Sequence, residues 1–457
     1  DYNYGDTPSV GSNLKYIREC NFKGNAIAYG TFRSSNLVKV GTITCSGSNV
    51  WWSSESLFQN SKNLEEVECV NMTGANSTTN WFASCPKLKR VGKVNVNAKN
   101  INQMYAYCPQ LTELALPTLT NLERMSGFIR GCTSLTELHL DEITENTPLE
   151  YMDWAFRDCP NLTSVTIGGT TLPPTLVTME GAYYGDKMLT KVIPLPNDFN
   201  NKCSMGSCCY GCSSLTDDNI YKILPYNVSN MDYIYYACHG LVNPSIVVNS
   251  DRTSSKHCFD GCANMKSIRA EFNGTYSYGL GSFCNNCGEL TDAYIKFPYS
   301  LYFNDDAQTC SENYNIFSYC RKLVNVELDM TRLESKANFG SMFRQDKYIE
   351  SIKGFDLSKL HRDDRSPNDN TRYFTYDTSF EFMKDWVFAT NEEGNTKQLT
   401  NSYKMYNLEL TPTATIESLM NGLGTVQAET LTLGQATLNR LSEEQKANAV
   451  AKGWTLA

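Results

Sequence analysis

The stretch WAFRDCPNLTSVTI, residues 154–167, places a cysteine three residues after an aromatic residue and three residues before a leucine. If Phe156 is counted as position 0, Cys159 is at +3, Leu162 is at +6, and further apolar residues follow at +9 and +11. A catalytic thiol, a metal ligand, half of a disulfide and a packing residue all fit a cysteine considered alone. The rest of the chain decides which of these roles applies.

The same spacing recurs along most of the chain. Copies are anchored at residues 32, 58, 82, 105, 129, 156, 183, 209, 235, 259, 284, 317 and 343. Twelve of them share one frame with Leu, Met or Ile at +6, and the copy around Phe32 is one residue short. Steps between anchors are 23 to 27 residues, apart from one step of 33 residues before Phe317. Such a period, with short strands of alternating apolar residues, is typical of leucine-rich repeats.

A single repeat cannot bury its own apolar face, so the repeats are expected to stack into a solenoid with one continuous core. We therefore predict an α/β leucine-rich-repeat solenoid of about thirteen coils, one for each anchor. Short parallel strands are expected on the concave side, and loops and short helical turns on the convex side. Positions +6 to +11 should form the strand, and positions −1, 0 and +3 the opposite wall. The outward positions +8 and +10 then form a polar face of mixed charge, with Tyr294 as its one aromatic residue.

Composition and periodicity divide the chain into three regions. These are a solenoid over residues 1–354, degenerate coils with an exposed polar loop over 355–410, and a C-terminal strand–helix–strand cap over 411–457. In the cap, Thr415 is the expected N-cap of a short helix that ends at Gly422. A second helix is expected to begin with a capping box of Ser442 and Gln445 and to end at Gly453.

The repeat resembles the BspA-like leucine-rich repeats, whose unit reads roughly I-G-x-x-A-F-x-x-C-x-x-L-x-x-I-x-I-P. The segment YMDWAFRDCPNLTSVTI, residues 151–167, is the best copy, and the resemblance covers roughly residues 14–354. The ending LTLGQATLNRLSEEQKANAVAKGWTLA looks like a closing segment of repeat proteins in gut bacteria and their bacteriophages. The chain departs from the family in that most copies lack the proline after the strand and the loops between coils are longer and more aromatic. The resemblance implies surface display, adhesion and binding of macromolecules or glycans, without catalysis.

Cysteine fills position +3 in nine copies, at residues 85, 108, 132, 159, 212, 238, 262, 287 and 320. A small residue of low polarity in successive coils predicts a packing ladder of reduced, buried thiols. The C-x-x-C pairs at 209/212 and 284/287 have the spacing of metal sites, but the repeat accounts for both, because cysteine replaces the aromatic residue at position 0. No metal site is therefore predicted. A local disulfide or metal ion near Cys203 and Cys208 stays an alternative, as does a disulfide among the off-ladder cysteines 20, 45, 69, 203 and 310.

The composition argues against several classes of function. A net charge of −9 provides no basic footprint for nucleic acid. The sequence has no run of eighteen apolar residues, so we expect no insertion into a membrane. It also lacks the G-x-S-x-G, Walker A, H-E-x-x-H and dinucleotide-binding motifs, so we expect neither an enzyme nor a cofactor.

The sequence therefore favours a non-enzymatic recognition or adhesion protein that binds a macromolecule, either a protein or a glycan. Display on a bacterial cell surface or a bacteriophage particle is expected, with secretion as the alternative. A structural component that associates with copies of itself, in a virion or a surface layer, is the alternative function. Aromatic residues in loops on a rigid scaffold are the candidate contact set. They are Trp51, Trp52, Tyr276, Tyr278, Tyr299 and Tyr302.

Overall fold

The computed structural model describes residues 13–22, 30–45, 55–301, 315–334, 342–343, 346, 348–349, 351–354, 403–404 and 413–457. The chain forms two compact units. The first comprises Asp1–Leu215 with Asn219–Tyr221, and the second comprises Thr216–Asp218 with Lys222–Ala457. The boundary between them falls inside the region predicted as one solenoid. In the described residues, no helix is both long and apolar enough to cross a bilayer.

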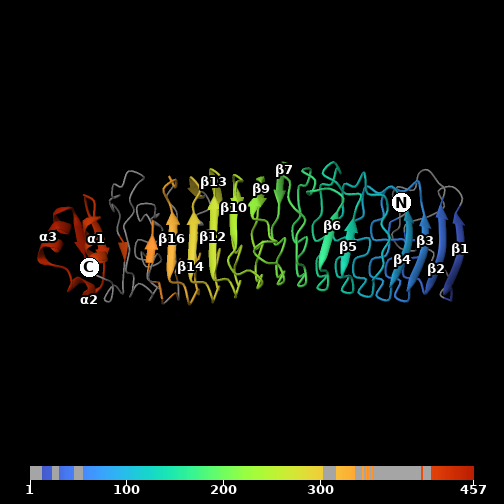
Figure 1. Cartoon of the computed structure of the whole chain (residues 1–457), viewed down its shortest axis with the longest axis horizontal. Helices are drawn as coiled ribbons and strands as arrows, with labels where there is room; N and C mark the ends of the chain where they lie inside the picture. Colours follow the sequence, from blue (N-terminus) through green and yellow to red (C-terminus); the bar gives the residue numbers. More distant parts are fainter. Residues whose placement is uncertain are drawn as a thin grey trace, which may run out of the picture. The chain divides into compact units, whose positions relative to one another are not determined.

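In the first unit, successive coils contribute strands that pair in parallel (Figure 1). The strands β1 to β4 pair in chain order, and they are Tyr16–Phe22, Lys39–Cys45, Glu66–Asn71 and Arg90–Asn95. Further along, β5 (Glu137–Leu140) pairs with β6 (Ser164–Ile167), and β7 spans Asp198–Ser204. The strand β1 precedes the first anchored copy, so it adds one strand to those expected.

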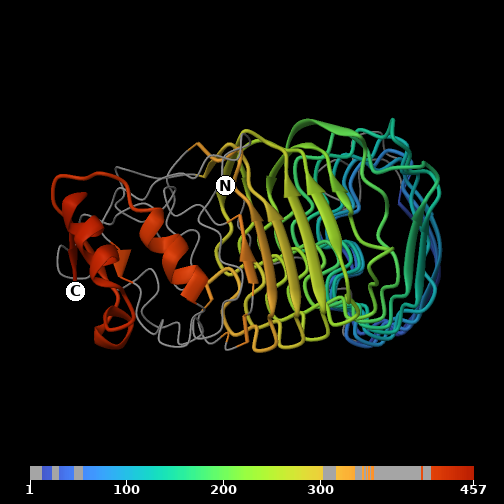
Figure 2. The same ribbon diagram turned by 60° about the vertical axis from the view of Figure 1, so that its left-hand side comes forward.

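The second unit contains a six-stranded parallel sheet, which Figure 2 shows. Its strands are β8 (Ile223–Leu224), β10 (Ser245–Val248), β12 (Ser267–Phe272), β14 (Asp292–Lys296), β16 (Asn325–Asp329) and β17 (Ser351–Lys353). Parallel strands contributed by successive repeats are the arrangement of a leucine-rich-repeat solenoid, so the predicted fold class is confirmed.

A second parallel ladder was not expected from the sequence. It lies five residues before each anchor, where loops and helical turns were predicted. In the first unit it consists of single bridges that link residues 77, 100, 124, 151, 178 and 204 in that order. In the second unit it widens into β9 (Tyr226–Asn230), β11 (Thr253–Ser254), β13 (Tyr276–Gly279) and β15 (Ser300–Leu301). Adjacent coils are therefore bonded along two walls.

The strands β3 to β6, β12, β14, β16 and β17 begin at +8, so the predicted start at +6 was wrong by two residues. At +6 the peptide N–H still closes a turn. In the opening stretch, Leu162 N donates to the carbonyl of Cys159 at 3.0 Å, and the ladder to the preceding coil begins only with Thr163. The leucine is nevertheless fully buried, so it anchors the start of the strand from inside the turn.

The inward position is also displaced in the first coils. In β3 the buried residues are Val67 and Val70, at +9 and +12, whereas Cys69 at the predicted +11 position is half-buried. The pairing between β2, β3 and β4 passes over Glu68 in β3 and Gly92 in β4. Each is an extra residue in its strand, so the alternation of buried and exposed side chains shifts by one residue after it. In β5 the predicted +9 and +11 positions, Leu138 and Leu140, are both buried.

Two left-handed residues shape the turn of every fully described coil. They lie at −2 and +2, and examples are Ser56 with φ 60° and Asn60 with φ 62°. Glycine occupies many of these positions, because it adopts positive φ without steric cost. The remaining ones carry Ser, Asn, Gln, Asp, His, Ala, Tyr or Trp, so no single residue type marks the turn in the sequence.

The cysteine at +3 forms a hydrogen bond between coils. Its Sγ donates to the backbone carbonyl of position 0 in the preceding coil, as from Cys132 to Tyr105 at 3.0 Å. The same bond, at 3.0–3.2 Å, is made by the thiols of residues 85, 108, 132, 159, 212, 262, 287 and 320. Ser61 occupies the same position and its hydroxyl donates to the carbonyl of Phe32 at 3.0 Å. The cysteine of the opening stretch is therefore a buried donor as well as a packing residue.

The C-terminal segment has a small parallel sheet and three helices. The strands are β18 (Tyr403–Lys404), β19 (Glu429–Thr432) and β20 (Trp454–Leu456), and the helices are α1 (Thr413–Asn421), α2 (Gln435–Leu438) and α3 (Glu443–Ala451). The capping box is present, because Ser442 Oγ accepts from Gln445 N at 3.1 Å and Gln445 Oε1 accepts from Ser442 N at 2.8 Å. The helix α1 already begins at Thr413, so Thr415 lies inside it and is not the N-cap.

A carboxyl group at +3 generates a prediction about pH. Asp186 is fully buried, and one of its oxygens accepts from Cys159 N at 2.8 Å while the other, Oδ2, has no partner. Burial, as the largest cause, holds the pKa of Asp186 well above its usual range, so the carboxyl is protonated in the folded chain at pH values where it is ionised in the unfolded chain. The folded state is therefore fully stable only below the unfolded pKa, and its stability falls as pH rises toward the folded pKa.

We expect Asp186→Cys to raise the melting temperature, and to raise it more near pH 7 than near pH 4, in thermal unfolding followed by circular dichroism. Ser61→Cys is the matched control, because it exchanges one neutral donor for another at the same position and should give a shift independent of pH. An equal effect of Asp186→Cys at both pH values would contradict the account of this carboxyl.

Candidate functional site

The C-x-x-C cysteines belong to the core. Cys209 and Cys212 are both fully buried, and burial holds the pKa of Cys209 well above its usual range. Across the described part of the chain, no three His, Cys, Asp or Glu side chains gather in a way that could hold a metal ion. All described cysteines, which run from Cys20 to Cys287 and include Cys320, are free thiols. Cys310 lies outside the described residues.

Three of the six predicted contact residues, Trp51, Trp52 and Tyr302, lie outside the described residues. The other three lie on, or directly before, strands of the second ladder in the second unit. Tyr276 and Tyr278 belong to β13, where both are half-buried and their rings meet edge to face at 5.5 Å. Tyr299 is 39 % exposed, and the guanidinium of Arg332 lies 4.2 Å from its ring centroid. The structure therefore places Tyr276 and Tyr278 on β13 and Tyr299 directly before the neighbouring strand β15, and all three side chains are only partly exposed.

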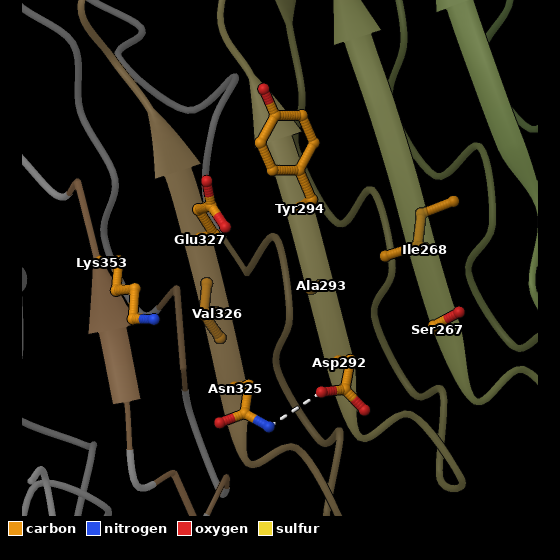
Figure 3. Close-up of a pocket in the computed structure, with 9 residues that line it drawn as sticks. All are labelled: Ser267, Ile268, Asp292, Ala293, Tyr294, Asn325, Val326, Glu327 and Lys353. Atoms are coloured by element: carbon orange, nitrogen blue, oxygen red, sulfur yellow. Dashed lines mark hydrogen bonds between the residues drawn. The ribbon is translucent and has the colours of Figure 1, made fainter. Parts of the chain in front are cut away.

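A better-defined group of side chains lies on the solvent face of the six-stranded sheet (Figure 3). We call the outward side chains on β12, β14, β16 and β17 the strand face, and they are Ser267, Arg269, Asp292, Tyr294, Asn325, Glu327 and Lys353. All of them except Arg269 line a shallow hollow of about 230 Å³. At +8, Asn325 Nδ2 donates to Asp292 Oδ1 at 2.8 Å. At +10, the strand register places Arg269, Tyr294, Glu327 and Lys353 side by side in that order.

Tyr294 is the centre of the +10 row. The guanidinium of Arg269 lies 3.9 Å from its ring centroid and is held there by two hydrogen bonds to Glu271 Oε1, at 2.6 and 3.0 Å. The Glu271 contact raises the pKa of Arg269, and partial burial raises the pKa of Tyr294, so the guanidinium stays charged and the phenol stays a donor. Glu327 and Lys353 beside them are exposed. The face thus presents an aromatic ring, donors, acceptors and both signs of charge on a rigid sheet, which suits binding.

The corresponding face of the first unit is organised differently. A string of ion pairs crosses it, from Lys39 to Glu66 at 3.2 Å, from Glu66 to Arg90 at 2.9 Å and from Arg90 to Glu113 at 3.0 Å. The hydrogen bonds in this string lower the pKa of Glu66 and raise that of Arg90. These charges already have partners, which leaves them less available to a ligand. Ile193, predicted to face outward at +10, is buried at 4 % exposure, because its coil forms no strand there.

The prediction of polar, mixed-charge strand rows around Tyr294 agrees with the structure. The sequence did not reveal that Arg269 stacks on this ring, since the two residues are 25 positions apart and meet only through the register. A second group, which includes the half-buried Arg130 and the exposed Trp154, was also missed. Its residues lie in the turn around each anchor, where the apolar frame gives no signal about outward side chains.

The comparison with protein-family models agrees with this architecture. The model of the BspA type leucine-rich repeat region matches in six copies, over residues 25–163, 102–224 and 181–307. A leucine-rich repeat protein from Bacteroides ovatus, known from a crystal structure, is 18% identical over 71% of this chain and 91% of its own, with a TM-score of 0.37. No curated protein sequence matches the chain.

The thiols generate the prediction of this section. Burial holds the pKa of Cys108, Cys159 and Cys262 well above the usual range and raises that of Cys132 to about 12. Since the thiolate is the reactive form, the nine ladder cysteines should resist iodoacetamide in the native protein and react after unfolding without reductant. Mass spectrometry of the alkylated peptides gives the readout.

The half-buried Cys69 is an internal control and should react before the ladder does. Native alkylation of the ladder at the rate of Cys69, or a ladder that stays unreactive after unfolding because it is disulfide-bonded, would refute the assignment of reduced, buried donors.

Proposed function

The chain belongs to the BspA-type leucine-rich repeat family, and we propose that it is a non-enzymatic recognition or adhesion protein that binds a protein partner through the strand face of its second unit. Repeat proteins of this family are generally binding or adhesion proteins. The side chains on the strand face can stack on an aromatic or guanidinium group and can donate and accept hydrogen bonds, and these are the contacts that association requires.

The stacked pair Tyr294–Arg269 carries this proposal. Tyrosine and arginine dominate the binding energy of protein interfaces when they lie near the centre of a contact with polar residues around them. Here the ring and the guanidinium are held 3.9 Å apart by a carboxylate, so little side-chain freedom is lost on binding. Glu327 and Lys353 continue the row with opposite charges, which favours a partner of complementary, mixed charge.

We further propose display on a bacterial cell surface or on a bacteriophage particle, with secretion as the alternative. The support is the chemistry of the ladder. Its thiols are sealed in the core with raised pKa values, so they would persist in the reduced state outside the cell, and the repeat would not depend on disulfide formation.

The test is binding of fluorescently labelled protein to a panel of intact bacterial and epithelial cells, measured by flow cytometry. Tyr294→Ala should weaken binding by about tenfold or more, the size of effect that an interface centre shows, with little change in melting temperature. Tyr226→Ala is the matched control, because Tyr226 is 58 % exposed but lies on β9, in the other sheet.

Equal binding by both variants would show that the binding site does not lie on the strand face. Binding to no cell type, together with a stable multimer in light scattering at micromolar concentration, would instead favour the alternative function of a self-assembling component.

A further inference from the structure

A row of arginine and aromatic side chains follows the turns of the first unit. We call it the turn row, and its members are Tyr107, Arg130, Trp154, Arg157, Tyr184 and Tyr210. The guanidinium of Arg130 lies 5.4 Å from the ring of Tyr107 and 5.5 Å from that of Trp154. Arg157 lies 6.0 Å from Trp154 and 4.3 Å from Tyr184, whose ring stacks on Tyr210 at 4.3 Å. Successive coils thus continue the row in one direction.

The backbone under this row does not favour large side chains. Trp154 and Tyr107 occupy the left-handed positions −2 and +2, with φ 54° and 58°. A bulky residue with positive φ is strained, whereas glycine is not. Folding alone would therefore favour glycine, as at Gly127 and Gly181, the −2 residues of the two flanking coils. A tryptophan kept at such a position points to a role other than folding.

The glycine of the next coil makes room for the indole, because a Cβ at Gly181 would lie 2.6 Å from Trp154 Cδ1. Gly127, in the preceding coil, lies against Gln103 instead, where an added Cβ would be 3.1 Å from Cγ. The indole therefore lies across the backbone of the next coil, where no side chain other than hydrogen fits. It remains 44 % exposed in spite of the two arginines beside it.

A hollow of about 430 Å³ opens beside this indole, within the range of roughly 300–1,000 Å³ that is typical of small-ligand sites. Its walls include Gln103, Arg130, Tyr151, Asp153, Trp154 and Glu180. Asp153 accepts from the hydroxyls of Thr178 and Ser126, and Glu180 accepts from Ser204, so both carboxylates are oriented but keep free lone pairs. Arg130 Nε is buried and has no hydrogen-bond partner among the described residues.

We propose that this hollow binds a sugar unit of a neutral glycan chain. Arg130 and Arg157 would repel a strongly cationic ligand, and Asp153 and Glu180 would repel a strongly anionic one. A neutral sugar ring can place its apolar C–H face on the indole and share its hydroxyls between the carboxylates, the amide of Gln103 and the guanidinium of Arg130. Because the aromatic rings continue over successive coils, spaced by about 4.8 Å as parallel strands are, the row suits an extended chain. This site is separate from the strand face and does not depend on it.

The test uses affinity electrophoresis with four soluble neutral polysaccharides, a β-glucan, a starch, a xylan and a mannan, followed by calorimetry with oligosaccharides of any that retards the protein. We expect retardation by at least one of them. Trp154→Gly should weaken that binding by about tenfold or more, the loss typical of removing an aromatic anchor. It should not lower the melting temperature, because glycine relieves the positive φ.

Tyr233→Gly is the matched control. Tyr233 is an exposed aromatic residue at −2 with φ 59°, but it lies in the second unit, so its removal should leave glycan binding unchanged. Tyr294→Ala should also leave it unchanged, which keeps this site distinguishable from the proposed strand-face function. The proposal is overturned if none of the four polysaccharides binds, if Trp154→Gly binds as well as the unmodified protein, or if the site prefers sulfated glycans or peptides.

Discussion

The structure depends on the hydrogen bonds that each coil forms with the buried backbone N–H and C=O groups of the coil before it. The anchor residue at position 0 is bound at both of its peptide groups by the next coil. Tyr105 N donates to the carbonyl of Phe128 at 3.0 Å, and Tyr105 O accepts from the thiol of Cys132 at 3.0 Å. A buried carbonyl without a donor would cost about 1–3 kcal/mol. A thiol or hydroxyl at +3 removes that cost where no backbone N–H of the same coil reaches the carbonyl, and this explains why cysteine and serine share the position.

This bond also determines where outward side chains can lie. The stacked coils keep their spacing, so residues at one repeat position form a regular row on the surface. In the first unit the +8 row pairs charge with charge, as in Glu66 and Arg90. In the second unit the +10 row places Tyr294 against Arg269 and leaves Glu327 and Lys353 exposed. The turns carry Trp154 and its arginines in the same manner. A rigid scaffold of this kind can hold separate binding surfaces whose residues vary without altering the core.

The core and the fold class could be predicted because every coil repeats the same buried residue types, and Leu162 and Cys159 are enough to find the frame. The start of the strand could not be predicted, because the N–H of Leu162 is hydrogen-bonded within the turn and is not free for the strand ladder. The second ladder could not either, because its members, such as Arg124, Tyr151 and Thr178, share no residue type. Of the candidate sites, the outward rows around Tyr294 followed from the alternation of the strand. The hollow beside Trp154 could not be predicted, because it depends on glycines in neighbouring coils and on carboxylates at −3, a position that the apolar frame does not include.

The most direct test of the inter-coil hydrogen bond compares Cys132→Ser with Cys132→Ala in urea unfolding. The serine variant keeps a donor of similar size, as at Ser61, whereas the alanine variant leaves the carbonyl of Tyr105 without a partner. The account predicts that the alanine variant loses about 1–3 kcal/mol more of the free energy of unfolding than the serine variant. A serine variant that is less stable than the alanine variant would contradict it, because position +3 would then require an apolar residue and not a donor.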